Sequence, residues 1–231
     1  MHIMREIVLD TETTGLDPYS GHRVVEIGCV ELVNHVATGT VFHTYLNPER
    51  DMPPEAERVH GISAEFLKDK PLFKAIAKSF LAFIGDSRLV IHNATFDLKF
   101  LNAELERDDF PLIDAARATD TVLIARQKFP GQPASLDALC KRFNIDLGRR
   151  TKHGALLDAE LLADVYLELK GGRQSALLLK KEEEAEEAAS IGFRGHTAIE
   201  ERHFPASAEE KAAHRALLEK MKKPIWKALA G

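Results

Sequence analysis

Several acidic residues lie at the ends of predicted strands or at the starts of predicted helices within one domain. Asp10 and Glu12 follow an apolar run at residues 6–9. In a strand, residues i and i+2 point to the same face, so these two carboxylates would lie side by side at the end of the strand. Like charges placed together raise the free energy unless a cation bridges them. Solvated turn acids would explain this pair alone, but the apolar run before it and the turn at residues 13–15 favour a metal site.

A third acid, Asp97, follows a short apolar strand predicted at residues 89–92. The sequence HNATFD at residues 92–97 leads from this strand into a helix. Such turns place polar groups at the carboxyl edge of a sheet, where α/β folds bind their ligands. Taken alone, Asp97 is better explained as a first-turn acid that interacts with the helix dipole.

A fourth acid, Asp158, lies five residues after His153. On one regular helix this spacing would place the two side chains about 140° apart. They converge if His153 and Gly154 form a loop before the helix, since glycine permits a sharp bend. A surface or capping histidine is the alternative. We predict the loop, with His153 turned toward a metal that Asp158 binds.

The combined set is suited to phosphodiester hydrolysis. Two divalent cations about 4 Å apart activate a water and stabilise the leaving oxygen in such reactions. Oxygen ligands favour Mg²⁺ or Mn²⁺ over zinc, and a neutral histidine accepts the proton of the water. We therefore expect Asp10, Glu12, Asp97 and Asp158 as ligands of two cations and His153 as the base. No Ser-His-Asp arrangement, P-loop or GxGxxG motif in the sequence competes with this interpretation.

The elements that would position these residues form a mixed α/β pattern. Strands are predicted at 6–9, 24–33, 41–46 and 89–92, with 34–39 connecting the second and third as antiparallel neighbours. Helices are predicted at 73–84, after 92 through Leu105, and at 122–128, 136–143 and 155–169. Strands followed by alternating strands and helices predict a mixed sheet flanked by helices, in a domain that spans residues 1–170.

Composition and charge narrow the class of protein. Apolar residues make up 45% of the 231 residues and the formal charge is −5, which argues against a large basic nucleic-acid footprint. The only cysteines, Cys29 and Cys140, lie in apolar stretches, which indicates buried thiols rather than a disulfide framework. No long apolar run or signal-peptide core is present, so we expect a cytoplasmic protein.

The chain changes character after residue 170. Residues 1–170 hold 20 Lys and Arg against 26 Asp and Glu, whereas residues 171–231 hold 11 against 10. Residues 171–195 contain a charged low-complexity run that indicates a linker, and a solvated helix is the alternative. Residues 196–231 regain order with a capping box at Ser207–Glu210, apolar residues at spacings of four, and the only Trp at 226. This segment is typical of a partner-docking helix, and packing back onto the domain is the alternative.

Three blocks of sequence resemble the exonuclease motifs of the DEDDh superfamily: DTETTGL at 10–16, HNATFD at 92–97 and HGALLDA at 153–159. More narrowly, the chain is similar to the epsilon (proofreading) subunits of bacterial DNA polymerase III. Further matches are VEIG at 25–28, EAERVHGI at 55–62, TDTV at 119–122, FPG at 129–131 and SLDALC at 135–140. The resemblance covers nearly all of residues 5–170.

The resemblance implies a ribonuclease H-like sheet and a 3′→5′ exonuclease that proofreads DNA and releases 5′-mononucleotides. It implies that Glu55 and His60 contact the terminal nucleotide and that Asp120 supports the site. It implies that a 3′-end pocket is lined by Thr13, Asn93 and Phe96, next to Asp10, Glu12 and Asp158. It also implies docking of the C-terminal tail on the polymerase (alpha) subunit, and contact of Gln174–Leu179 with the sliding clamp, although the last position is Leu rather than an aromatic residue.

Two alternatives stay open on the sequence. RNA-trimming relatives such as ribonuclease T and oligoribonuclease share the five catalytic residues, although the long tail and the additional matches argue against them. The other alternative is an interaction subunit that has lost its catalytic activity. The presence of all five predicted catalytic residues argues against it.

Overall fold

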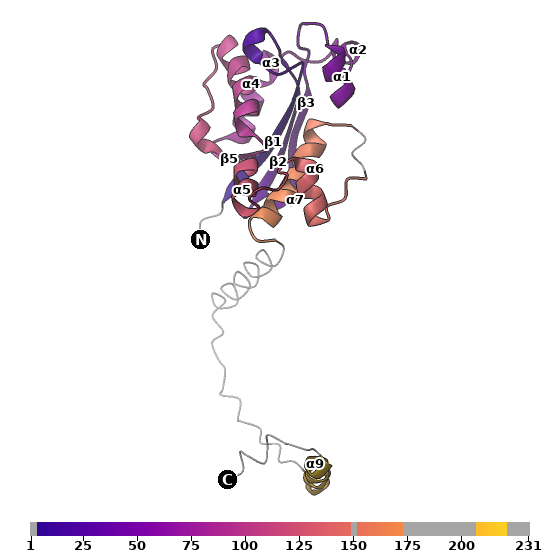
Figure 1. The fold of residues 1–231 in the computed structure, drawn as a ribbon. Helices are drawn as coiled ribbons and strands as arrows, with labels where there is room; N and C mark the ends of the chain where they lie inside the picture. The colour runs from indigo at the N-terminus through magenta and orange to yellow at the C-terminus, as the bar shows by residue number, and fades with distance from the viewer. Residues whose placement is uncertain (1–3, 149–151, 173–206, 221–231) are drawn as a thin grey trace, which may run out of the picture. The chain divides into compact units, whose positions relative to one another are not determined.

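The computed structural model describes residues 4–148, 152–172 and 207–220 (Figure 1). The chain divides into two compact units, Met1–Glu184 and Ala185–Gly231. The predicted linker at 171–195 and the predicted clamp-binding peptide at 174–179 lie almost wholly outside the described residues.

A five-stranded mixed sheet forms the centre of the first unit, in the order β3-β2-β1-β4-β5. Its strands are β1 (Arg5–Thr13), β2 (Val24–Val33), β3 (Val36–Tyr45), β4 (Arg88–Ile91) and β5 (Ala118–Asp120). β2 runs antiparallel to both β1 and β3, while β4 runs parallel to β1 and β5. The prediction of a mixed sheet flanked by helices is confirmed.

The β2–β3 hairpin differs from its prediction. β3 begins at Val36, so the six-residue connection expected at 34–39 is wrong and the turn consists of Asn34 and His35 alone. Both residues have positive φ, 51° and 67°, as a two-residue hairpin turn of this hand requires. The first half of β3 escaped prediction because residues 36–41 are exposed and carry no apolar alternation.

Helices cover both faces of the sheet, as Figure 1 shows. The helices of the first unit are α1 (Pro54–His60), α2 (Ala64–Leu67), α3 (Phe73–Ile84), α4 (Ala94–Arg107), α5 (Thr121–Lys128), α6 (Leu136–Phe143) and α7 (Ala155–Leu169). Short 3₁₀ turns occur at η1 (Pro18–Ser20) and η2 (Ala115–Arg117). The five predicted helices of this unit are present, whereas α1, α2 and β5 were not predicted.

Strand β1 is buried on both faces and separates two apolar cores. Ile7 and Leu9 point toward α3 and α4, into a core that includes Phe80 and Phe100. Val8 points the other way, into a core built with α6 and α7. The same alternation therefore directs Asp10 and Glu12 toward the α7 face and Thr11 toward the α4 face.

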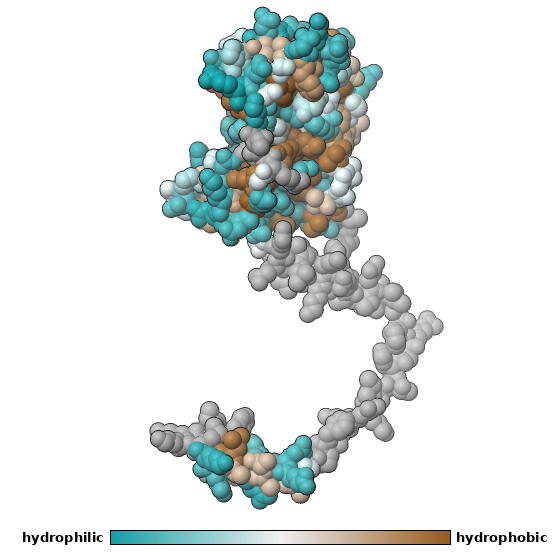
Figure 2. Space-filling model, turned by 90° about the vertical axis from the view of Figure 1, so that its right-hand side faces the viewer, coloured by the Kyte–Doolittle hydropathy of each residue, from teal (hydrophilic) through white to brown (hydrophobic). Residues whose placement is uncertain are grey.

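The two cysteines are buried, as predicted. Burial raises the pKa of the Cys29 thiol, which keeps it protonated. Among the residues that the structure describes, no helix is long and apolar enough to span a membrane. Polar residues cover much of the face in Figure 2, and hydrophobic residues gather across the middle of the first unit.

The described part of the second unit is helix α9 (Ala208–Lys220). The predicted capping box is confirmed: the Glu210 amide donates to Ser207 Oγ at 3.2 Å, and the Ser207 amide donates to Glu210 Oε2 at 2.8 Å. Leu217 on this helix is 58% exposed. The remaining apolar positions of the predicted stripe, at 221 and 225, and Trp226 lie outside the described residues.

Candidate active site

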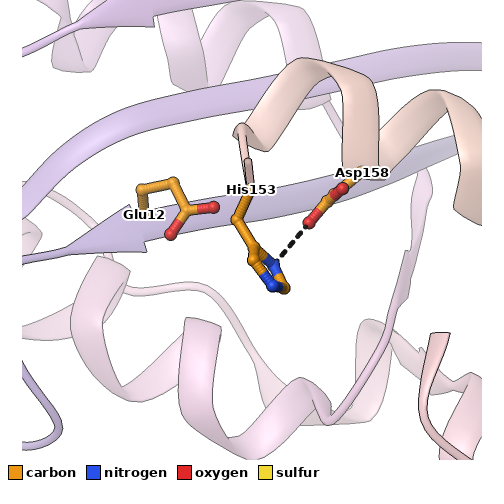
Figure 3. A group of neighbouring side chains, drawn as sticks. All are labelled: Glu12, His153 and Asp158. Carbon is orange, nitrogen blue, oxygen red and sulfur yellow. Dashed lines mark hydrogen bonds and ion pairs between the residues drawn. The ribbon is translucent and has the colours of Figure 1, made fainter. Parts of the chain in front are cut away.

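Glu12, His153 and Asp158 come together at the end of β1 (Figure 3). One potential ligand atom from each lies within 4.8 Å of the other two. Glu12 extends from the strand and Asp158 from α7, with the imidazole between them. His153 Nδ1 lies 3.2 Å from Asp158 Oδ2, and Asp158 is buried whereas the His153 side chain is 48% exposed. A carboxylate pair with an accessible imidazole is thus assembled from segments about 140 residues apart in the sequence.

Two residues of β2 let α7 approach this closely. Gly28 is the register partner of Asp10, and a Cβ on Gly28 would lie 2.3 Å from backbone atoms of Ala155. Glu26 is the register partner of Glu12, and its buried Oε2 accepts a hydrogen bond from the Ala155 amide at 3.1 Å. The other carboxylate oxygen of Glu26 lies 2.7 Å from His43 Nε2. Glu26 therefore caps the first turn of α7, where Asp158 lies.

Sequence reasoning did not assign a role to Glu26 or Gly28. The available signal was their place on β2: an acid and a glycine two residues apart, opposite two other acids, in a strand whose other residues are apolar except Glu31. A buried glutamate in such a strand needs a partner, and the open amides at a helix N-terminus are suitable partners.

The loop expected before α7 is confirmed. The helix begins at Ala155, Gly154 is extended, and His153 lies outside the helix. The His153 amide donates to the Val59 carbonyl of α1 at 3.3 Å, which ties this loop to the wall of a neighbouring cleft.

Asp97 reaches the site from the opposite face of the sheet. It lies in the first turn of α4 and is 3% exposed. Its Oδ1 accepts hydrogen bonds from the Thr11 amide at 3.0 Å and the Thr11 hydroxyl at 2.7 Å. Burial raises the pKa of Asp97 to about 7, and the nearby charge of Asp120 adds to this effect. The carboxylate is thus fixed beside the residue that separates Asp10 from Glu12.

Asp120 supports the helix that carries Asp97. Its carboxylate accepts from the amides of Asn93 and Ala94, both at 3.2 Å, and from the Val122 amide at 2.8 Å. One side chain therefore caps α4 and α5 together. Asp120 therefore acts on the site in two ways: it holds the backbone before Asp97, and its charge contributes to the raised pKa of Asp97.

A cleft of about 590 Å³ opens next to Glu12. Of the residues predicted to contact a terminal nucleotide, it is lined by Glu12, Thr13, Glu55, His60 and Phe96. His60 is buried, and its Nδ1 accepts from the Ile62 amide at 3.0 Å, so the proton is on Nε2. Burial lowers the pKa of His60, which keeps the ring neutral.

Asn93 does not line this cleft. It is exposed, has a φ of 69°, and lines a separate pocket with His92, Thr95 and Asp120. The physical reason is the turn before α4, in which Asn93 has a left-handed backbone and its amide donates to Asp120, a residue of the same separate pocket.

Comparison with known proteins fixes the family. A family model described as "Exonuclease" matches residues 7–166. The chain is 64% identical over 179 residues to the DNA polymerase III subunit epsilon of Rickettsia conorii, covering 76% of this chain and 78% of the relative. It is 46% identical over 239 aligned positions to the DNA polymerase III subunit epsilon of Escherichia coli, covering 98% of each chain.

The chain belongs to the epsilon-subunit family of DNA polymerase III. Members of this family are 3′→5′ proofreading exonucleases, and the resemblance of the three motifs is confirmed by the match over the whole chain. The ribonuclease H-like fold is supported by the solved structures that match this chain.

Solved structures agree on the fold. The nuclease domain of 3′hExo, a DEDDh family member bound to rAMP, matches with a TM-score of 0.61 at 18% identity, covering 74% of this chain and 94% of that domain. Exonuclease X in complex with 5′ overhanging duplex DNA matches with a TM-score of 0.56 at 24% identity, covering 71% of this chain and 90% of that chain. At these identities the likeness shows the fold alone.

Proposed function

We propose that this epsilon-family exonuclease removes mispaired nucleotides from DNA 3′ ends by two-metal hydrolysis and releases 5′-mononucleotides. The observation that carries the proposal is the convergence of Glu12, His153 and Asp158 beside a cleft that holds the predicted nucleotide contacts. Asp10 and Asp97 complete the set, because Thr11 between Asp10 and Glu12 binds Asp97.

The residues fit two hard divalent cations. Asp97 and Asp158 are buried carboxylates, and a buried anion needs a nearby positive charge to remain ionised. Four carboxylates supply the oxygen ligands that Mg²⁺ and Mn²⁺ prefer. When bound, two such cations would lower the pKa of an attacking water and stabilise the leaving oxygen. We assign Asp10, Glu12, Asp97 and Asp158 as their ligands.

His153 is the proposed proton acceptor. With Asp158 ionised, the 3.2 Å contact places the proton of a neutral imidazole on Nδ1, which donates to Asp158 Oδ2. Nε2 is then the unprotonated nitrogen of a half-exposed ring. A histidine oriented in this way by a carboxylate accepts the proton of a water on its other side.

The cleft is the proposed site of the terminal nucleotide, with His60 Nε2–H as a donor and Phe96 as an apolar contact. A mispaired base costs less free energy to unstack than a paired one, so frayed ends would enter more often. The acidic domain needs few phosphate contacts if the polymerase subunit raises the effective concentration of the primer end. We propose docking on that subunit through residues 196–231, clamp contact through 174–179, and a cytoplasmic location.

Nucleotide release tests this function. With Mn²⁺, the protein should release 5′-monophosphates from a mispaired DNA primer faster than from a paired primer or a short RNA, and Asp10→Ala should abolish the release. Activity confined to RNA would move the protein to the RNA-trimming relatives, and no activity on either substrate would support a decayed subunit. A pull-down of the polymerase subunit with and without residues 180–231 tests the docking segment.

A further inference from the structure

A second hollow lies beside the candidate active site, on the other side of the first turn of α4. It has a volume of about 690 Å³ and includes Asn93 and Thr95 in its lining. Phe96, the next residue, lines the cleft proposed for the terminal nucleotide. Asp97, in the same turn of the helix, is buried. The two linings therefore meet at consecutive residues of the first turn of α4.

Hydrogen-bond donors dominate the polar lining of this second hollow. Besides Asn93 and Thr95, it contains Arg126, Gln132 and Ser135. The Ser135 oxygen already accepts from the Ala138 amide, which leaves its hydroxyl hydrogen to donate. The one carboxylate of the lining, Asp120, already accepts hydrogen bonds from three backbone amides.

Arg126 gives the hollow its positive charge. It is exposed on α5 and makes no hydrogen bond or ion pair with any residue that the structure describes. Among the described residues that line the hollow, Arg126 is the one Lys or Arg. Guanidinium groups bind phosphate through paired N–H donors.

We infer that the hollow lined by Asn93, Arg126 and Gln132 binds the substrate strand just upstream of the terminal nucleotide, with Arg126 contacting a backbone phosphate. The inference rests on the proposed function, because it needs a DNA 3′ end in the neighbouring cleft. The strand passes over the first turn of α4, from the cleft lined by Phe96 to the hollow lined by Thr95. Leu123, which is 62% exposed at the same hollow, gives an apolar surface for the sugar or base.

Steady-state kinetics on two substrates test this inference. Thymidine 5′-(p-nitrophenyl phosphate) has one phosphodiester and nothing upstream of it, whereas an oligothymidylate of about ten nucleotides fills both hollows. Arg126→Met should raise KM for the oligonucleotide about 10-fold or more, as loss of a charged hydrogen bond does. It should lower the slope of log KM against log salt by about 0.7, the value for one phosphate contact on a single strand. Both constants for the small ester should stay unchanged.

Lys78→Met is the matched control, because Lys78 is an exposed cation on α3 away from both hollows. It should leave KM and the salt slope unchanged, and Arg126→Lys should recover the slope. Thermal unfolding of each variant checks the fold. The inference is overturned if Arg126→Met matches Lys78→Met on the oligonucleotide, or if it impairs both substrates equally. Wild-type protein that is inactive on both substrates would instead contradict the proposed function itself.

Discussion

Asp97→Asn should stabilise the metal-free protein at pH 8 while abolishing its nuclease activity. The pKa of Asp97 is raised to about 7 because the carboxyl is buried. The folded protein therefore keeps a proton that the unfolded chain releases above its ordinary pKa of 3.8, and stability falls as pH rises from about 4 to about 7. The two pKa values differ by about three. Above pH 7 this difference lowers the free energy of unfolding by about 4 kcal/mol.

Asparagine removes this penalty without removing the hydrogen bonds. Its Oδ1 still accepts from the amide and hydroxyl of Thr11, which both donate to Oδ1 of Asp97. We expect the free energy of unfolding of Asp97→Asn to exceed that of wild type by about 2–4 kcal/mol at pH 8 and by no more than about 1 kcal/mol at pH 4.5. Urea unfolding in EDTA at both pH values measures the difference.

Two results would refute this reasoning. One is a variant that is no more stable than wild type at pH 8, and the other is a gain that is the same at pH 4.5. Added Mg²⁺ supplies an internal control, because a ligand that binds only the folded state stabilises it. Mg²⁺ should raise the unfolding midpoint of wild type and have a much smaller effect on Asp97→Asn.

Three further substitutions test how the site is positioned. Gly28→Ala would place a Cβ 2.3 Å from the backbone of α7; we expect kcat to fall about 100-fold, as for a displacement of about 1 Å, and wild-type kcat would contradict the packing. Glu26→Ala leaves the buried amide of Ala155 without its acceptor, so thermal unfolding should show a loss of about 1–3 kcal/mol; an unchanged midpoint would rule out the capping role. His153→Ala should lower kcat about 10²- to 10⁴-fold with the fold intact by circular dichroism, and a kcat within twofold of wild type would remove His153 from the chemistry.

Much of the site could be predicted because its residues stand at the ends of strongly patterned elements. The apolar run of β1 places Asp10 and Glu12 at its end, and the stripe of α7 places Asp158 in the first turns of that helix. The loop position of His153 followed from the spacing of five residues and the glycine between. These are local features, and local pattern is what a single sequence shows best.

The roles of Glu26 and Gly28 could not be predicted because they arise from register. Glu26 matters only because β2 pairs it with Glu12 and because α7 begins next to it. Neither fact is visible without the three-dimensional arrangement. Helix α1 is a different case: Pro54 at its start and Gly61, with a φ of 75°, after its end are recognisable signals. Its seven residues were too few to show a clear apolar period.

Anomalous diffraction from a crystal grown with Mn²⁺ and thymidine monophosphate tests the central claim most directly. The account predicts two Mn²⁺ peaks about 4 Å apart, liganded by Asp10, Glu12, Asp97 and Asp158, with the nucleotide in the cleft beside His60. Absence of Mn²⁺ at these carboxylates, with nucleotide bound, would contradict it.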